Sequence, residues 1–452
     1  MVLKRKAYEQ LLSWKKECNG SRAILVEGAR RIGKSTIVEE FAKNEYKSYI
    51  LIDFAKVSNT VIDAFEKHKN NFDELFMILS LEYGIKLFKR ESVIIFDEVQ
   101  LYPEARQLIK YLVADGRYDY IETGSLISIK ENVQNILIPS EERKLKMYPL
   151  DFEEFCWCFD EELLIDYIKK RFEEKKPLED GLHDKAMLLF KQYMLIGGMP
   201  KSIIAFIEGT RDFDAADREK RDILNLYRDD ILKINTRYRS KVLVIFEQIP
   251  GFLSKHEKRV VLNKIAEGST IDQYTDTFFW LGNSMICNEC FLTRDPNIGL
   301  ALNEDRSYIK CYMGDTGLLV SHAFDENSLA DSELYRQIIN DKLSLNEGML
   351  YENAIAQMLT AKGHKLYFYT HYNEEKHRND IEIDFIISNN NKLKYKIYPI
   401  EVKSTKKYSI TSLERFKEKY SSRIGGCYVI HPKNLSVKDG ITYLPAYMAM
   451  CL

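Results

Sequence analysis

One eight-residue loop constrains the fold of this chain more than any other feature of its sequence. Residues 28–35 read Gly-Ala-Arg-Arg-Ile-Gly-Lys-Ser, which matches the pattern G-x-x-x-x-G-K-[ST]. The loop follows the apolar run AILVE at residues 23–27 and precedes the helix-forming run TIVEEFAK. Because a loop of this kind joins a strand of a parallel sheet to a helix, the spelling and its context predict an α/β domain.

Further apolar runs support a parallel sheet. They lie at residues 48–53, 92–96, 118–122 and 144–148, and helical patterns separate most of them. This spacing is typical of parallel strands joined by crossover helices. Pro149 follows the last run, and a proline would stop a central strand. We therefore expect the first domain to cover residues 1–150.

The chemistry of the loop points to a nucleotide. Its two glycines let backbone amides face inward to cradle phosphates, and the helix terminus adds its dipole. Lys34 would reach the β- and γ-phosphates, and Ser35 would offer its hydroxyl to Mg²⁺. ATP and Mg²⁺ are the expected cofactors. The predicted nucleotide contacts are Gly28, Ala29, Arg30, Arg31, Ile32, Gly33, Lys34, Ser35 and Thr36.

Two later strand ends would meet the same nucleotide. The run VIIF is followed by Asp97, a predicted magnesium ligand, and by Glu98, the predicted general base for a water that attacks the γ-phosphate. Thr123, in IETGS, could touch the γ-phosphate or that water. The alternatives are two solvated acids that cap the next helix, and an ordinary strand-to-loop Thr-Gly-Ser.

These segments carry a family resemblance. The runs GARRIGKST, IIFDEVQ, ETGS, MYPLDFEEF, IGGMP and YMGDTGLL resemble the AAA+-type ATPases of bacteria and archaea that carry a C-terminal domain of unknown function. The resemblance implies a nucleotide-hydrolysing switch or motor with Thr123 in the sensor position. It does not identify an arginine finger. Arg143 is one candidate, although a solvated charge in SEERKLK is the favoured interpretation.

The rest of the chain divides into three predicted regions. Residues 151–235 carry amphipathic helical patterns and are expected to form a helical lid. Residues 236–330 mix short helical patterns with a strand-like run at 308–313, compatible with a winged-helix-like connector. Residues 340–452 contain a helix followed by strand-like runs, which predicts a separate α/β domain.

A second acidic group lies in this last region. Strand alternation puts Glu401 and Lys403 on one face, and Asp384 and Glu352 could join them. Three carboxylates and a lysine would suit magnesium-dependent phosphodiester cleavage, with the acids as metal ligands and Lys403 as a catalytic group. The order resembles the PD-(D/E)XK nuclease family. The alternative is an alternating strand with a surface ion pair.

Charge and composition bear on partners. The net charge of −2 excludes a globally basic nucleic-acid coat, but residues 341–452 hold 17 Lys and Arg against 12 Asp and Glu. This local excess favours DNA as a partner over a merely solvated face. The basic run contains Lys392, Lys394, Lys396, Lys403, Lys406 and Lys407. Nearby aromatic residues could stack on bases or belong to the core; they are Tyr367, Phe368, Tyr369 and Tyr372.

The leading hypothesis is a magnesium-dependent ATPase coupled to a nuclease-like domain that binds DNA and could cleave it. The alternative is an ATP-dependent interaction switch whose C-terminal domain binds nucleic acid or protein without catalysis. A metabolic kinase is disfavoured because most of the chain lies outside the nucleotide domain. No signal-peptide pattern or 18-residue apolar run is found, so we expect a cytoplasmic protein without a membrane span. A monomer and a homo-oligomer both stay open.

Overall fold

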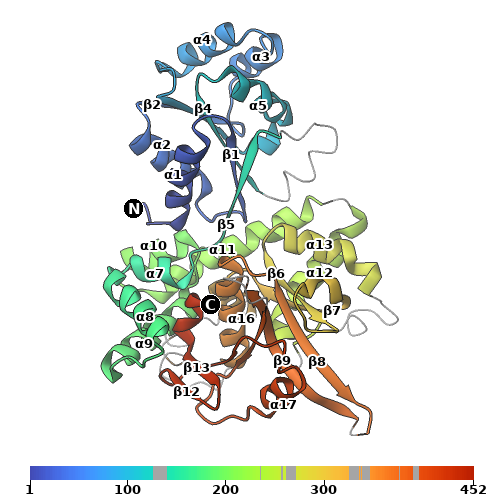
Figure 1. Cartoon of the computed structure of the whole chain (residues 1–452). Helices are drawn as coiled ribbons and strands as arrows, with labels where there is room; N and C mark the ends of the chain where they lie inside the picture. Colours follow the sequence, from blue (N-terminus) through green and yellow to red (C-terminus); the bar gives the residue numbers. More distant parts are fainter. Residues whose placement is uncertain are drawn as a thin grey trace. The chain divides into compact units, whose positions relative to one another are not determined.

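The chain folds into two compact units. The first comprises Met1–Tyr148 with Asn283–Met285, and the second comprises Pro149–Gly282 with Ile286–Leu452. Each unit is described by itself, and Figure 1 traces the first in blue to teal and most of the second in green to red. The computed structural model describes residues 1–125, 140–234, 236–255, 258–260, 271–324, 335, 337, 347–375, 377–389 and 396–452.

Unit 1 alternates strands and helices. Its elements are α1 (Lys6–Cys18), β1 (Ala23–Gly28), α2 (Lys34–Glu45), β2 (Ser48–Asp53), α3 (Asn59–Lys67), α4 (Phe72–Tyr83), β3 (Ser92–Asp97), η1 (Val99–Leu101), α5 (Pro103–Asp115), β4 (Asp119–Ser125) and β5 (Glu142–Met147). Among the described residues the strands form one sheet in the order β2-β3-β4-β1-β5. All pairings are parallel, so the predicted α/β sheet is confirmed.

The sheet of unit 1 explains where its polar residues gather. Every residue of β1 and of β3 is buried, as expected for strands with helices packed on both faces. Aromatic and aliphatic side chains such as Phe54, Phe65 and Phe96 fill the core between sheet and helices. Because the strands are parallel, the carboxyl ends of β1, β3 and β4 meet at one edge, where ligands of such sheets bind.

Unit 2 combines helices with a mixed sheet. Its elements are α7 (Phe152–Trp157), α8 (Glu162–Glu174), α9 (Asp180–Ile196), α10 (Pro200–Glu208), α11 (Phe213–Leu232), α12 (Thr236–Leu253), η3 (Ile271–Tyr274), α13 (Thr275–Asn283), β6 (Cys287–Thr293), η4 (Leu300–Asn303), β7 (Glu304–Met313), α14 (Thr316–Ala323), α16 (Glu347–Ala361), β8 (Leu366–Asn373), β9 (Arg378–Asn389), β10 (Lys396–Val402), α17 (Thr411–Lys419), β11 (Cys427–His431), β12 (Ser436–Lys438), β13 (Ile441–Pro445) and η6 (Ala446–Cys451).

The mixed sheet joins regions that the sequence separated. Within the described residues its strand order is β12-β13-β11-β10-β9-β8-β6-β7. Strand β6 pairs in parallel with β8, and β7 pairs antiparallel with β6. The predicted connector at 236–330 therefore contributes two strands to the sheet of the 340–452 region instead of standing apart. Residues 151–235 are largely helical, as their patterns predicted, and β8 and β9 form a long hairpin (Figure 1).

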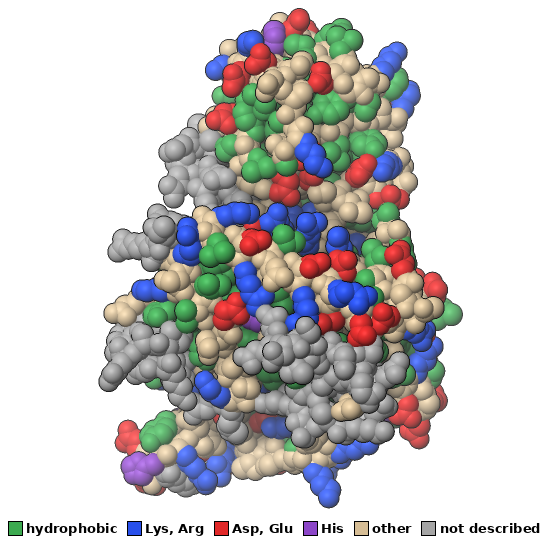
Figure 2. Space-filling view, turned by 180° about the vertical axis from the view of Figure 1, so that it is seen from behind, with side chains coloured by type: hydrophobic (Ala, Val, Ile, Leu, Met, Phe, Trp, Pro, Cys, Tyr) green, Lys and Arg blue, Asp and Glu red, His purple; other side chains and the backbone are tan. Residues whose placement is uncertain are grey.

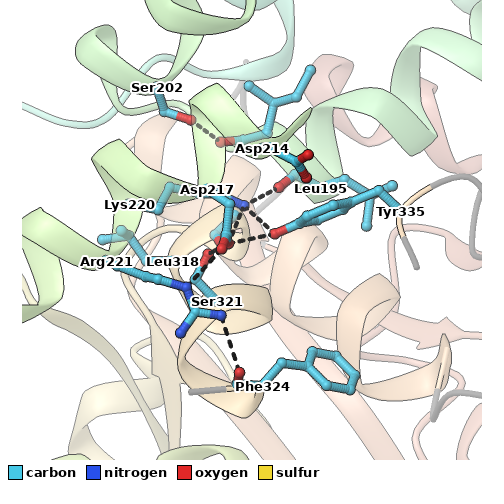
Figure 3. A network of polar contacts seen from close by, with 12 residues as sticks. Leu195, Ser202, Asp214, Asp217, Lys220, Arg221, Leu318, Ser321, Phe324 and Tyr335 are labelled. Carbon is cyan, nitrogen blue, oxygen red and sulfur yellow. Dashed lines mark hydrogen bonds and ion pairs between the residues drawn. The ribbon is translucent and has the colours of Figure 1, made fainter. Parts of the chain in front are cut away.

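A buried polar network ties the helices of unit 2 together (Figure 3). Asp217 on α11 accepts hydrogen bonds from Ser321 on α14, from the Tyr335 hydroxyl and from Arg221, each at 2.6 Å. The neighbouring Lys220 ammonium donates to the Leu195 carbonyl at 2.7 Å and to the Tyr335 hydroxyl at 2.9 Å. Lys220 is fully buried, and burial lowers its pKa to about 8 although Asp217 opposes the shift. The network fixes α11 against α14 and the end of α9.

Candidate functional site

The phosphate loop, Gly28–Ser35, connects β1 to α2 at the carboxyl edge of the sheet in unit 1. Its backbone requires glycine at both ends. Gly33 has φ of 88°, in the left-handed region, and begins α2 as its N-cap. A Cβ on Gly28 would lie 2.3 Å from the Met147 carbonyl oxygen, so only glycine lets β5 approach this closely.

Lys34 folds back over this loop. Its ammonium donates to the carbonyl oxygens of Ala29 at 2.7 Å and Gly28 at 3.2 Å, and only 6% of the residue is exposed. Burial lowers the pKa of Lys34 to about 8, while the nearby carboxylates of Glu98 and Asp97 act in the opposite direction. The ammonium is thus held at the loop by backbone carbonyl oxygens.

Asp97 joins two hydroxyl groups at the edge of the sheet. Its Oδ1 accepts a hydrogen bond from Ser35 Oγ at 2.7 Å and another from the Thr123 hydroxyl. The structure therefore brings together Ser35, Asp97 and Thr123, which come from three separate parts of the sequence. A carboxylate beside a hydroxyl offers the oxygen donors that Mg²⁺ prefers, so these residues fit the predicted ion.

Glu98 follows Asp97 in an unusual backbone conformation. Its φ is 53°, a left-handed value that costs a non-glycine residue about 1–3 kcal/mol. Its amide donates to Thr123 Oγ1 at 3.4 Å, and its carboxylate accepts a hydrogen bond from the Gln100 side chain. These contacts hold the half-buried carboxylate in place beside Asp97. Strain of this kind is concentrated at functional sites.

Arg5 is a loop contact that the sequence analysis missed. Its guanidinium donates to the Ile32 carbonyl at 2.8 Å and to the Tyr148 carbonyl at 2.6 Å. Arg5 is 6% exposed, so these hydrogen bonds are shielded from water. It therefore joins the phosphate loop to the chain just after β5. A basic residue in the run LKRKAY gave no sign of this role.

A buried arginine links helix α5 to strands β4 and β5 of the sheet. Arg106 on α5 contacts Glu142 through two atoms at 3.0 and 3.2 Å and lies 3.4 Å from Glu122. All three side chains are at most 3% exposed. Burial, together with the charge of Glu142, raises the pKa of Glu122 well above its usual range, against the opposing charge of Arg106. Glu122 immediately precedes Thr123, so this ion group supports the strand that presents the hydroxyl.

The arginine-finger candidate Arg143 and the two arginines of the phosphate loop lie in different environments. Arg143 is exposed and pairs with Glu17 at 2.7 Å, in agreement with the solvated interpretation. Arg31 is exposed, with φ of 68°, and Arg30 is half-buried. The described residues do not distinguish any of them as a finger.

A second candidate site lies in unit 2. A cavity of about 560 Å³ there is lined by Ser254, Lys255, Lys258, Glu382, Asp384, Glu401, Val402, Lys403, Ser409, Thr411 and Ser412. We call it the carboxylate cavity. Three of the four predicted nuclease residues, Asp384, Glu401 and Lys403, therefore face one space. The Lys403 ammonium lies 2.7 Å from Glu401, as strand alternation predicted.

The fourth predicted residue, Glu352, lies deeper. It sits on α16, is 1% exposed, and does not line the carboxylate cavity. Its carboxylate is contacted by Lys258, by the Tyr312 hydroxyl and by Lys310 at 3.3 Å. Although burial alone would raise it, the two lysines lower the pKa of Glu352 to about 2. The sequence analysis missed both lysines; the polar Lys310 inside the apolar run YIKCYM was the available signal.

The remaining carboxylates differ in environment. Burial raises the pKa of Glu401 to about 7, with Lys403 opposing the shift and Asp384 adding to it. Asp384 is 17% exposed, and its Oδ2 accepts a hydrogen bond from the Val402 amide at 2.8 Å. Within the part of the chain that the structure describes, no group of three or more His, Cys, Asp or Glu side chains is arranged to hold a metal ion.

The structure describes some of the aromatic residues and lysines that were predicted to contact DNA. Tyr367, Phe368 and Tyr369 are buried, so they belong to the core, whereas Tyr372 is 56% exposed. Lys392 and Lys394 lie outside the described residues, and Lys406 and Lys407 are exposed. In the view of Figure 2, basic side chains lie among acidic ones over the described surface.

Three parts of the chain match models of protein families. Residues 20–156 match the model of an AAA domain, residues 187–328 match a domain of unknown function (DUF8612), and residues 347–448 match another (DUF4143). No curated protein matches the chain. The first match confirms the expected AAA-type ATPase domain, which supports nucleotide binding and hydrolysis by unit 1. None of the described helices is long and apolar enough to span a membrane.

Solved structures give weaker likenesses. A Walker-type ATPase of Pyrococcus abyssi is 15% identical over 71% of this chain and 96% of its own, with a TM-score of 0.41. The Hsp104–ADP complex of S. cerevisiae is 14% identical over 80% of this chain and 44% of its own, with a TM-score of 0.29. The Thermotoga maritima RuvB Holliday junction branch migration motor is 13% identical over 68% of this chain and 92% of its own, with a TM-score of 0.29.

Proposed function

We propose that unit 1 binds ATP at the phosphate loop and hydrolyses it with Mg²⁺. The observation that carries this proposal is the meeting of Ser35 and Thr123 at one carboxylate oxygen of Asp97. These side chains lie at the edge of the parallel sheet where the loop begins α2. A phosphate chain at the start of this helix would find backbone amides and the Lys34 ammonium together.

Each residue has a distinct part in the proposed reaction. Lys34 neutralises the β- and γ-phosphates, while Ser35 and Asp97 hold Mg²⁺, which would neutralise charge on the phosphate oxygens. Glu98 takes a proton from the attacking water as its oxygen bonds to the γ-phosphorus. The bond from this phosphorus to the β-phosphate oxygen breaks, and ADP and phosphate leave. Thr123 orients the water or the γ-phosphate, and Gln100 fixes the Glu98 carboxylate.

Asp97→Asn tests this arrangement. The amide can keep one hydrogen bond but loses the charge that holds Mg²⁺, so steady-state phosphate release should fall by roughly 100-fold or more. Asp53→Asn is the matched control, because Asp53 ends the neighbouring strand β2 opposite Asp97 in the register. Its rate should stay near that of the unsubstituted protein. Normal hydrolysis by Asp97→Asn would exclude the proposed site.

For unit 2 we propose a nuclease-like domain that binds DNA and whose affinity depends on the nucleotide held by unit 1. Supporting this proposal are the helix α16 ahead of a strand hairpin, the shared cavity of Asp384, Glu401 and Lys403, and the local excess of Lys and Arg. An interaction switch without catalysis is the second candidate. It is favoured by the lysines that contact Glu352.

DNA binding can be measured by fluorescence anisotropy with labelled duplex and single-stranded DNA, with and without ATP. Binding should weaken as salt rises, because each phosphate contact releases counterions. Lys406→Glu combined with Lys407→Glu should weaken it further, whereas Lys67→Glu, an exposed lysine of unit 1 paired with Asp63, should not. Absence of any binding at low salt would favour a protein partner.

A further inference from the structure

We infer that Lys310 occupies the position of a metal ion in unit 2, and that the carboxylate cavity works without one. The inference goes beyond the proposed function, because it removes metal-dependent cleavage from this unit while leaving its capacity to bind. It rests on how the three predicted acids already pair with the protein's own lysines.

Glu352 is already paired with two cations of the protein. Its Oε1 faces the Tyr312 hydroxyl and the Lys310 ammonium, and its Oε2 faces the Lys258 ammonium. Two positive charges therefore already neutralise one buried carboxylate. A divalent cation could bind here only by displacing these donors, and Lys310 would then be left charged and buried.

Asp384 has one hydrogen bond and one longer contact with the same lysine. Its Oδ2 accepts the Val402 amide at 2.8 Å, and its Oδ1 lies 3.9 Å from the Lys310 ammonium. Lys310 thus lies between Glu352 and Asp384, two of the three predicted metal ligands. Its side chain is only 1% exposed, so water does not screen it.

Glu401 completes a balanced set. It pairs with Lys403 at 2.7 Å, so the predicted acids Glu352, Asp384 and Glu401 are matched by Lys258, Lys310 and Lys403. Glu382 and Lys255 also line the cavity and add one charge of each sign, so the acids are still not in excess of the lysines. A metal ion needs a surplus of negative ligands. An Mg²⁺ ion bound by Glu352 or Asp384 would also lie close to the ammonium of Lys310, and the two positive charges would repel each other. The residues present therefore do not fit the ion that the nuclease resemblance implies.

The central test is Mn²⁺ binding, measured from the electron paramagnetic resonance signal of the free ion. The full chain carries Asp97→Asn to remove the ligand in unit 1, and no nucleotide is added. We expect the number of Mn²⁺ ions bound per chain to be the same before and after Asp384→Asn and Glu401→Gln are added. One Mn²⁺ per chain that disappears with these two substitutions would overturn the inference.

A second measurement asks whether removing the internal cation creates a metal site. In Lys310→Met, Glu352 and Asp384 lose their shared partner, so we expect Mn²⁺ to bind and to raise the Tm. Lys365→Met is the matched control, because Lys365 pairs with Glu304 at 2.6 Å elsewhere in the sheet. If Lys310→Met does not fold, Lys258→Met replaces it, since Lys258 is the more exposed partner of Glu352. A folded variant that gains no Mn²⁺ affinity would contradict the replacement of a metal by lysine.

Discussion

Replacing Arg106 by Met should destabilise unit 1 more than any surface substitution. The guanidinium lies between Glu142, with contacts at 3.0 and 3.2 Å, and Glu122 at 3.4 Å, and all three side chains are almost fully buried. Removing one partner of a buried ion pair costs about 3–5 kcal/mol, because the remaining charge stays desolvated. Here two carboxylates lose their counterion, so we expect the upper part of this range.

This free energy converts to a measurable change in Tm. A unit of about 150 residues loses roughly 2–4 °C per kcal/mol, so the Tm of unit 1 should fall by about 8–16 °C for a loss of about 4 kcal/mol. Differential scanning calorimetry of the full chain measures it, and the transition of unit 1 is the one that ATP raises. Arg143→Met is the control, since its exposed pair with Glu17 should be worth at most about 1 kcal/mol.

The dependence on pH gives an independent check. Burial raises the pKa of Glu122 and of Glu142 above the value for an exposed carboxyl, so the folded state holds protons that the unfolded state has lost. Their contribution to stability is therefore greatest at low pH and is lost as pH rises through the folded-state pKa. The Tm of Arg106→Met should be less depressed at pH 5 than at pH 8. The reasoning is refuted if Arg106→Met costs no more than Arg143→Met.

Three further predictions follow from single contacts. Gly28→Ala places a methyl group 2.3 Å from the Met147 carbonyl oxygen and should weaken ATP binding at least about 10-fold by calorimetric titration, whereas Gly181→Ala, which meets no atom within 4 Å, should not. Glu98→Gln should bind ATP normally but release phosphate roughly 100-fold more slowly, since the amide cannot accept the water's proton. Asp217→Ala should cost about 3 kcal/mol in urea unfolding because Lys220 stays buried without its carboxylate; a loss under about 1 kcal/mol would contradict that role.

The sequence predicted the nucleotide half of the chain well for a physical reason. A strand, a glycine-rich loop and a helix are local in sequence, and parallel pairing brings the ends of β1, β3 and β4 to one edge without further information. The sequence alone could therefore predict that Ser35, Asp97 and Thr123 lie close together. The roles of the phosphate-loop residues and of Glu98 stay predictions.

Long-range partners could not be predicted. Arg5 reaches the Ile32 carbonyl across 27 residues, and Lys310 reaches Glu352 across 42, with no local pattern that marks either contact. The sequence also did not predict that residues 236–330 join the mixed sheet, because β6 and β8 pair across regions that it assigned to separate domains. Composition also suggested a basic face, but a charge excess says nothing of which lysines are paired inside the fold.

The measurement that tests the central claim most directly is ATP hydrolysis by Lys34→Ala beside Lys43→Ala. Both lysines lie on α2, but Lys34 is buried at the phosphate loop, whereas Lys43 is exposed and pairs with Glu39 at 2.8 Å. Phosphate release with Mg²⁺ should fall to background in Lys34→Ala and stay at the rate of the unsubstituted protein in Lys43→Ala. Equal rates in all three proteins would contradict the assignment of the loop as the ATP site.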